Sequence, residues 1–410
     1  MRKPALPFIF VTLVLDILGI GLIVPVLPDL VKHFQGGDVA QASHTYGLLA
    51  SVYALMQFVC APILGSLSDR YGRRPVILLS LLGSGLDYLL LAFAPNLAWF
   101  FVGRVVSGIT GANFAAATAY IADVSPPEKR AANFGLVGAA FGLGFIIGPA
   151  MGGVLGHYDL RLPFIVAGVL TLINWLYGWF VLPESLGQEN RRAFSWAKSN
   201  PVGALVNLGR SHPMVLGLAI AYFLLCVAHQ VYPSTWVLYA SHRYGWSELD
   251  TGLSLAAVGF CAALVQGGLT RKIVPKIGES KAIMLGVAVA VVAFTGYGLA
   301  THGWMIYPLI VFGSISGITT PAVQALISKG VGADEQGGVQ GSLTSLNSVA
   351  GIIGPFVATG LFGHFVKTTP AVPGAAFFCG AALNLLALAV AIRSLRASNH
   401  PAETPEAPRS

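Results

Sequence analysis

The stretch that decides the fold is Pro7–Pro28, PFIFVTLVLDILGIGLIVPVLP. A helix needs roughly 20 apolar residues to cross the hydrocarbon core of a bilayer, and this run supplies them. Pro25 and Pro28 close the run where a helix would end, and no signal-peptide cleavage site of the A-x-A kind is apparent. We therefore interpret the run as a retained first membrane span. One carboxylate, Asp16, lies near its middle, where an ionisable side chain is costly.

The rest of the chain has the same apolar character. Its 410 residues are 55% hydrophobic and only 10% charged, whereas soluble domains carry about 25% charged residues. The apolar runs lack the two-residue alternation of barrel strands, so helices are expected. The predicted spans are 7–28, 44–66, 75–95, 98–123, 131–157, 161–182, 212–240, 247–271, 280–301, 303–329, 336–364 and 374–396. The fold class is therefore an all-α integral membrane protein with twelve transmembrane helices.

Short repeats divide the chain into two related halves. SGIT occurs at Ser107–Thr110 and Ser316–Thr319, and IIGP occurs at Ile146–Pro149 and Ile352–Pro355, each pair separated by about half the chain. Parallel repeats of this kind bind substrate between the halves and rock one half against the other. The predicted domains are an N-terminal six-helix bundle at 1–182, a cytoplasmic linker at 183–211, a C-terminal six-helix bundle at 212–396 and a disordered tail at 397–410.

The positive charges predict the orientation. Most of the 24 lysines and arginines fall in the linker, the tail and the loops on the side of the termini, which places both termini in the cytoplasm of a bacterial-type inner membrane. The net charge of +7 does not indicate a nucleic-acid partner, because the bases are dispersed over short loops. The expected surroundings are the lipid bilayer, and we expect a monomer. The four cysteines lie in apolar runs and are expected to be reduced thiols, without a metal site.

Three ionisable residues lie inside predicted spans of the first half: Asp16, Asp87 in GSGLDYLLLAF, and Arg104. Such residues usually face a polar interior and mark proton or substrate pathways. The simpler alternative is a structural ion pair between Arg104 and one of the acids. Because two acids share one base, we predict proton chemistry here, concentrated in the first six helices.

A glycine-rich charged loop follows the second predicted span, GSLSDRYGRRPV at Gly65–Val76. Glycines permit a tight turn, and an acid among three bases suits an ion pair that forms and breaks. The alternative is an ordinary positive loop of the cytoplasmic side. The predicted gate residues are Gly65, Asp69, Arg70, Gly72, Arg73 and Arg74. A counterpart after the eighth span, GGLTRKIVPKIGESKA, keeps glycines and bases but lacks the acid at its start.

The fifth span carries glycines at every fourth position, Gly144, Gly148, Gly152 and Gly156, with Pro149 beside one of them. Small residues at this spacing form a flat face for close helix packing. Packing and a sealing role in transport both remain open from this pattern.

Polar side chains in other spans predict a cavity for an amphipathic molecule. The candidates are Gln57, Asn113, His229, Gln230, Gln324 and Asn347, with Asn174, Gln266 and Gln340 as further amides. Each alone is more often a helix–helix hydrogen bond than a ligand. The chain contains no H-E-x-x-H, G-x-S-x-G or Walker A motif, so neither an enzyme nor an ATP-driven pump is expected, and no cofactor is required.

Several motifs together resemble the major facilitator superfamily. GSLSDRYGRRPV resembles its signature after helix 2, GRVVSGITGA that of helix 4, and GFIIGPAMGG the helix 5 motif of antiporters. LDILGIGLIVPVLP and YALMQFVCAPILGSLSDRYGRRPV resemble the drug:proton antiporter branch and, within it, tetracycline efflux proteins. The resemblance implies that Asp16, Asp87 and Arg104 serve proton coupling. It also implies that Asp123 joins the gate and that Gln57 lies near the drug path.

The sequence departs from that pattern at two positions. Ala262 and Ala290 stand where the resemblance implies a histidine and an aspartate tied to coupling. We therefore expect a proton-coupled exporter of small amphipathic molecules, with tetracycline-like drugs or another hydrophobic compound as substrate. A uniporter or a proton symporter of a metabolite is the alternative within the fold. A non-transporting receptor or scaffold is the alternative of another class, although it would need an extramembrane module.

Overall fold

The computed structural model describes residues 6–111, 114–126, 130–191, 213–329, 331 and 336–399. Within these residues, 12 helices are long and apolar enough to cross a membrane. This confirms the predicted all-α membrane fold. Most of the predicted linker, the tail from residue 400 and Asn113 lie outside the described residues.

The first half builds six spans from eight helices. The first and fourth spans each consist of two consecutive helices, α1 with α2 and α5 with α6. The helices are α1 (Leu6–Ile23), α2 (Leu27–Phe34), α3 (Val39–Tyr71), α4 (Arg73–Ala92), α5 (Leu97–Thr110), α6 (Phe114–Val124), α7 (Arg130–Tyr158) and α8 (Leu162–Val181).

The second half repeats this plan. A π-helical turn at Val265–Leu269 interrupts its second span, and a 3₁₀ segment at Ile315–Ile318 interrupts its fourth. The helices are α10 (Pro213–Tyr244), α11 (Glu248–Leu264), α12 (Thr270–Ile277), α13 (Glu279–Leu299), α14 (Ile306–Ser314), α15 (Thr319–Lys329), α16 (Gln336–Phe365) and α17 (Ala375–Asn399). The fourth span is therefore interrupted in both halves, in each case at or just beside the SGIT repeat.

Two glycines make the equivalent tight turns of the halves. Gly72, between α3 and α4, has φ of 105°, and Gly278, between α12 and α13, has φ of 81°. Side chains with a Cβ rarely adopt this left-handed backbone conformation. In each case the next residue begins the third span of its half.

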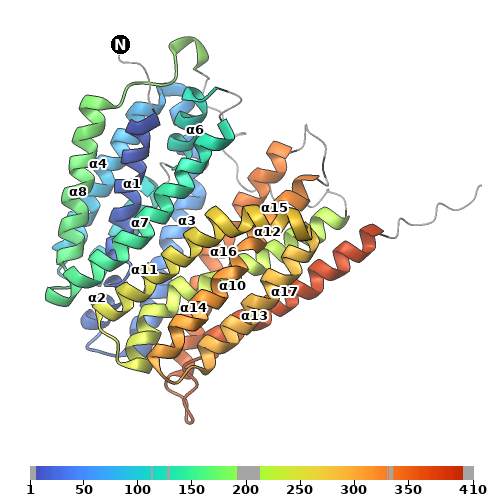
Figure 1. Cartoon of the computed structure of the whole chain (residues 1–410). Helices are drawn as coiled ribbons and strands as arrows, with labels where there is room; N and C mark the ends of the chain where they lie inside the picture. The colour runs from blue at the N-terminus through green and yellow to red at the C-terminus, as the bar shows by residue number, and fades with distance from the viewer. Residues whose placement is uncertain are drawn as a thin grey trace, which may run out of the picture.

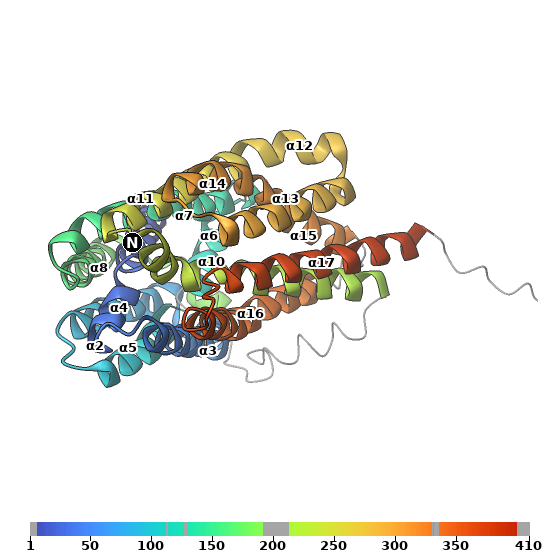
Figure 2. The same ribbon diagram turned by 90° about the horizontal axis from the view of Figure 1, so that it is seen from below.

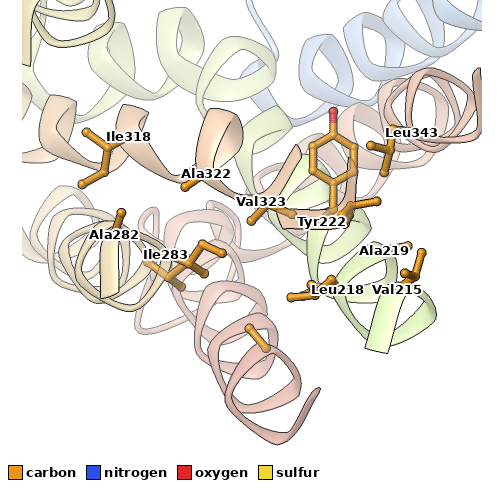
Figure 3. Close-up of a cluster of buried hydrophobic side chains, with 14 of the residues drawn as sticks. Val215, Leu218, Ala219, Tyr222, Ala282, Ile283, Ile318, Ala322, Val323 and Leu343 are labelled. Carbon is orange, nitrogen blue, oxygen red and sulfur yellow. The ribbon is translucent and has the colours of Figure 1, made fainter. Parts of the chain in front are cut away.

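Each half has its own apolar core. In the first half, Leu22, Phe100 and Phe164 are fully buried in one cluster. In the second half, Figure 3 shows a cluster in which Tyr222 of α10 lies among aliphatic residues such as Val323 and Leu343. Within a bilayer such side chains stabilise the bundle mainly by close van der Waals packing, because lipid tails are as apolar as they are. The cores therefore lie within the halves, which leaves the surfaces between the halves free to separate.

The two halves diverge on one side of the molecule and meet on the other (Figure 1). We call the side on which α1 begins and α3 ends the termini side, and the opposite one the far side. Two helix pairs make most of the contact between the halves, α3 with α16 and α7 with α11, and Figure 2 shows both pairs side by side. α10 adds smaller contacts with α2 and α3.

Hydrogen bonds between the halves fall in the far half of these helices. Ser43 Oγ donates to the carbonyl oxygen of Thr359 at 2.8 Å, and Ser51 Oγ donates to that of Ile352 at 2.7 Å. Toward the termini side, by contrast, a Cβ placed on Gly135 of α7 or Gly341 of α16 would meet nothing within 4 Å. The structure is therefore closed on the far side.

Candidate functional site

The three intramembrane charges of the first half converge on one cavity. Asp16 from α1, Asp87 from α4 and Arg104 from α5 all line a cavity of about 170 Å³. Their exposed fractions are 5%, 2% and 7%. Helices from three different parts of the sequence thus bring two acids and one base to a single buried site. Their roles stay a prediction.

A serine stands between the arginine and one of the acids. Arg104 Nη2 donates to Ser107 Oγ at 3.2 Å, and Ser107 Oγ donates in turn to Asp87 Oδ2. The other oxygen of this carboxylate, Oδ1, is buried without a hydrogen-bond partner in the structure. Sequence reasoning gave Ser107 no role, although it follows Arg104 by three residues and so faces the same side of the helix.

The guanidinium of Arg104 also lies 5.6 Å from the ring centroid of Tyr53, a geometry that attracts a cation. The Tyr53 hydroxyl accepts a hydrogen bond from Gln57 Nε2 at 2.9 Å. A Cβ placed on Gly111 would lie 3.0 Å from Gln57 Nε2 and 3.2 Å from the Tyr53 hydroxyl. Gln57 therefore lies at the point where α5 ends, one side chain away from the buried charges.

The predicted cavity residues of the second half separate into two kinds. Gln230 packs against α16, because a Cβ on Gly354 would lie 2.5 Å from Gln230 Cβ. Gln324 Nε2 donates to the Tyr222 hydroxyl at 3.4 Å, which joins two helices of one half. His229 and Asn347, by contrast, are exposed. These last two fit an open cavity better than the amides that pack.

The predicted gate is centred on Arg73. Its Nη1 lies 2.6 Å from Asp69 Oδ1, and its Nε lies 3.1 Å from Asp123 Oδ2. The two neighbouring arginines face elsewhere. Arg70 lies over the ring of Tyr71, and Arg74 donates to the carbonyl oxygen of Trp179 at 2.6 Å. One arginine therefore connects the ends of α3, α4 and α6.

Glu184 completes this group and was missed by the sequence reasoning. Its carboxylate accepts hydrogen bonds from the backbone N–H groups of Arg73, Arg74, Ser185 and Leu186 at distances of 2.9 to 3.3 Å. A carboxylate at the N-terminus of α4 satisfies amides that have no partner within the helix. The available signal was an isolated acid directly after the sixth span.

The second half carries a related ion pair of opposite polarity. Glu279 is the first residue after Gly278, as Arg73 is the first after Gly72. Glu279 Oε1 lies 2.5 Å from Lys329 Nζ at the end of α15. The counterpart loop, GGLTRKIVPKIGESKA, lacks an acid at its start but has Glu279 near its end. The base of this ion pair, Lys329, lies on α15.

The glycines of α7 form one packing face, and a second face lies beside it. Gly144, Gly148 and Gly152 contact α1, where a Cβ on Gly148 would lie 2.7 Å from Gly21 Cα, and Gly156 contacts Val26 just beyond α1. The second face crosses to α11. There a Cβ on Gly153 would lie 2.5 Å from the Glu248 carbonyl oxygen, and one on Gly252 would lie 2.4 Å from that of Pro149. One face of α7 thus packs within the first half and the other packs against the second half, whereas a sealing role in transport stays a prediction.

An ion pair joins the halves at the far side. Lys367 Nζ, beyond α16, lies 2.8 Å from Asp38 Oδ2, and the other carboxylate oxygen of Asp38, Oδ1, caps α3. The hydrogen bond from the Lys367 ammonium holds the pKa of Asp38 below its usual value of 3.8. Both groups are exposed, so the pair is screened by solvent.

Comparison with known proteins places the chain in a family. The model of the major facilitator superfamily matches residues 9–355. The class C tetracycline resistance protein of Escherichia coli is 43% identical, over 94% of this chain and 95% of that protein. The class D protein of Salmonella ordonez is 37% identical, over 96% and 97%. The crystal structure of the human organic anion transporter MFSD10 has a TM-score of 0.70 and 27% identity, covering 95% of this chain and all of that one. The chain therefore belongs to the major facilitator superfamily and is, over most of its length, a relative of the bacterial tetracycline resistance proteins.

Proposed function

We propose that this chain is a proton-coupled antiporter that exports small amphipathic molecules from the cytoplasm, with tetracycline-like drugs as the leading substrates. The observation that carries the proposal is the buried cavity lined by Asp16, Asp87 and Arg104. Ionisable side chains at this depth are costly, and where they occur they usually mark a proton or substrate pathway. The full-length relationship to the tetracycline resistance proteins supports the choice of substrate.

The termini side corresponds to the cytoplasm in this proposal, because most lysines and arginines of the chain lie there. The structure then represents a state closed to the outside, with Ser43 and Ser51 bonded across the far side. A substrate reaches the space between the halves from the cytoplasm. His229 and Asn347 are the exposed polar side chains that we assign to its binding.

The proton gradient is the energy source, and no cofactor takes part. Protons enter from the outside when the halves rock open there, and Asp16 and Asp87 hold them during the return. Arg104 favours the charged form of both acids, so that they release the proton once the site faces the cytoplasm. The ion pairs of Arg73 with Asp69 and Asp123 control closure of the cytoplasmic side. A monomer suffices, because one chain contains both halves.

Everted membrane vesicles from a host without drug pumps provide the test. An imposed gradient, acidic inside, is expected to drive accumulation of tetracycline, and collapse of the gradient is expected to release it. Asp16→Asn and Asp87→Asn are each expected to abolish uphill accumulation. The matched control is Glu189→Gln, which removes an exposed acid of the described linker segment.

Two results would contradict the proposal. Uphill accumulation by the Asp16→Asn/Asp87→Asn double variant would show that these acids do not couple transport. Accumulation only under the opposite gradient would indicate a symporter. A panel that includes hydrophobic cations and organic anions distinguishes tetracyclines from other substrates, which matters because Ala262 and Ala290 replace two polar groups implied by the family resemblance.

A further inference from the structure

We propose that Ser107 is a positioning residue that transmits the protonation state of Asp87 to the interruption of the fourth span. The inference rests on the proposed function, because it takes Asp87 as a proton carrier. Its basis is the placement of one hydroxyl between Arg104 Nη2 and Asp87 Oδ2, on the last turn of α5.

The hydroxyl can bond in only two ways. A serine hydroxyl donates one hydrogen bond and accepts others. The arginine always donates, so it permanently occupies one acceptor position of Ser107. A charged Asp87 can only accept hydrogen bonds, so in that state the hydroxyl proton of Ser107 points to Oδ2, along the contact between Ser107 Oγ and Asp87 Oδ2. This arrangement ties α5 to α4.

Protonation of Asp87 reverses the bond. The acid then carries the O–H and donates it to Ser107, so the serine proton must find another acceptor. The carbonyl oxygen of Gly103, four residues earlier, is within reach of such side chains in a helix. Thr110 already makes this kind of bond to the Val106 carbonyl oxygen, at 2.9 Å. No proton passes through the hydroxyl, because only the direction of each hydrogen bond changes.

The reversed hydrogen bond is expected to change the bend of α5. Back-bonding of serine to the carbonyl four residues earlier bends helices, and Ser107 lies three residues before Thr110, the last residue of α5. The next helix, α6, carries Asp123, which holds Arg73 at the termini side. A change of bend at the interruption therefore moves one partner of the gate ion pair. The two hydrogen-bond directions supply the bistable element that such coupling needs.

Other groups around the cavity affect the same equilibrium. The titratable side chains facing Asp87 and Ser107 are Asp16 from α1, Tyr46 and Tyr53 from α3, Tyr88 from α4 and Arg104 from α5. The test must therefore remove the serine hydroxyl and leave all five unchanged.

The experiment measures the distance between the halves at the termini side as a function of pH, without substrate. Spin labels are attached to Gly135→Cys and Gly341→Cys, two positions with open space around them, after replacement of the four free cysteines. The distance distribution is recorded by electron–electron double resonance between pH 5 and pH 9. The variants are Ser107→Ala, Ser107→Thr as the rescue, and Thr118→Ala, which removes a helix back-bond in α6 away from the cavity.

Ser107→Ala is expected to move the midpoint of the pH-dependent change upward by about one pH unit, because the charged form of Asp87 loses a donor. Ser107→Thr is expected to restore the midpoint, and Thr118→Ala to leave it unchanged. An unchanged midpoint in Ser107→Ala overturns the proposal, as does the absence of any pH-dependent change in the parent protein.

Vesicle transport separates this result from the proposed function. A parent protein that exports nothing in the panel, yet shows the Ser107-dependent midpoint, refutes drug export and supports the role of Ser107. A parent protein that exports tetracycline with the same pH profile as Ser107→Ala supports export and refutes that role.

Discussion

The backbone seam between α7 and α11 gives the sharpest prediction for how the protein changes state. In Gly153→Ala, the new Cβ would lie 2.5 Å from the Glu248 carbonyl oxygen, 3.1 Å from Gly252 Cα and 3.2 Å from Leu249 Cα. All three are backbone atoms, so no side chain can rotate away. Overpacking of this kind costs about 1–3 kcal/mol. Because the contact joins the two halves in the state closed on the far side, we expect the strain to shift the equilibrium toward opening of that side by about 5- to 150-fold.

Spin labels on the far side measure this shift directly. Exposed positions Ala98, at the start of α5, and Thr301, after α13, report the separation of the halves there. Gly360→Ala in α16 is the matched control, because its Cβ would meet nothing within 4 Å. The longer-distance population is expected to grow in Gly153→Ala and to stay unchanged in Gly360→Ala. A Gly153→Ala protein with the parental distance distribution and an unchanged melting temperature would refute the closed seam as described.

Three further predictions concern ionic contacts. Glu184→Gln is expected to lower the melting temperature by weakening the cap of α4, a loss of about 1 kcal/mol, and a melting curve equal to that of the parent would contradict this. Asp38 has its pKa lowered by Lys367, so its contribution is present above 3.8 and is lost as the pH falls through the lowered value. Acid should therefore increase far-side opening in the parent but not in Asp38→Asn, as measured with the far-side labels. Reversal of either charge in the Glu279–Lys329 pair should cost less than about 1 kcal/mol, because the pair is partly exposed. The double reversal Glu279→Lys/Lys329→Glu should restore the melting temperature, and a melting temperature that stays lowered would show that the loss does not come from the pairing of these two charges.

The spans could be predicted from the sequence because an uninterrupted run of about 20 apolar residues is enough to identify a membrane helix. The intramembrane acids were visible for the same reason, since a single carboxylate such as Asp16 stands out in an apolar run. Their convergence on one cavity requires that α1, α4 and α5 surround a common space, which hydropathy does not encode. The role of Ser107 could not be predicted from the sequence, because serine is common in membrane helices and only the structure shows which side chains it contacts.

The gate illustrates a second limit of sequence reasoning. The motif identified Arg73 and Asp69, because an acid four residues before a base in one short segment indicates a local ion pair. Glu184 lies 110 residues further along the chain than Arg74, so its contact with α4 depends on the return of α8 to the same end of the bundle. The glycine spacing in α7 likewise predicted a packing face, and the structure places most of that face against α1. The spacing did not reveal Gly153, which matters only because α11 from the other half approaches it.

The seam of α7 and α11 also bears on how such a protein can diversify. The contact there is made by main-chain atoms, many of them at glycine and proline positions. This contact does not depend on the chemical structure of the transported molecule. Exposed polar positions such as His229 and Asn347 lie outside that seam. Mutations that change which compound is recognised can therefore accumulate without changing the contacts between the halves. The same two-bundle fold can then transport different compounds.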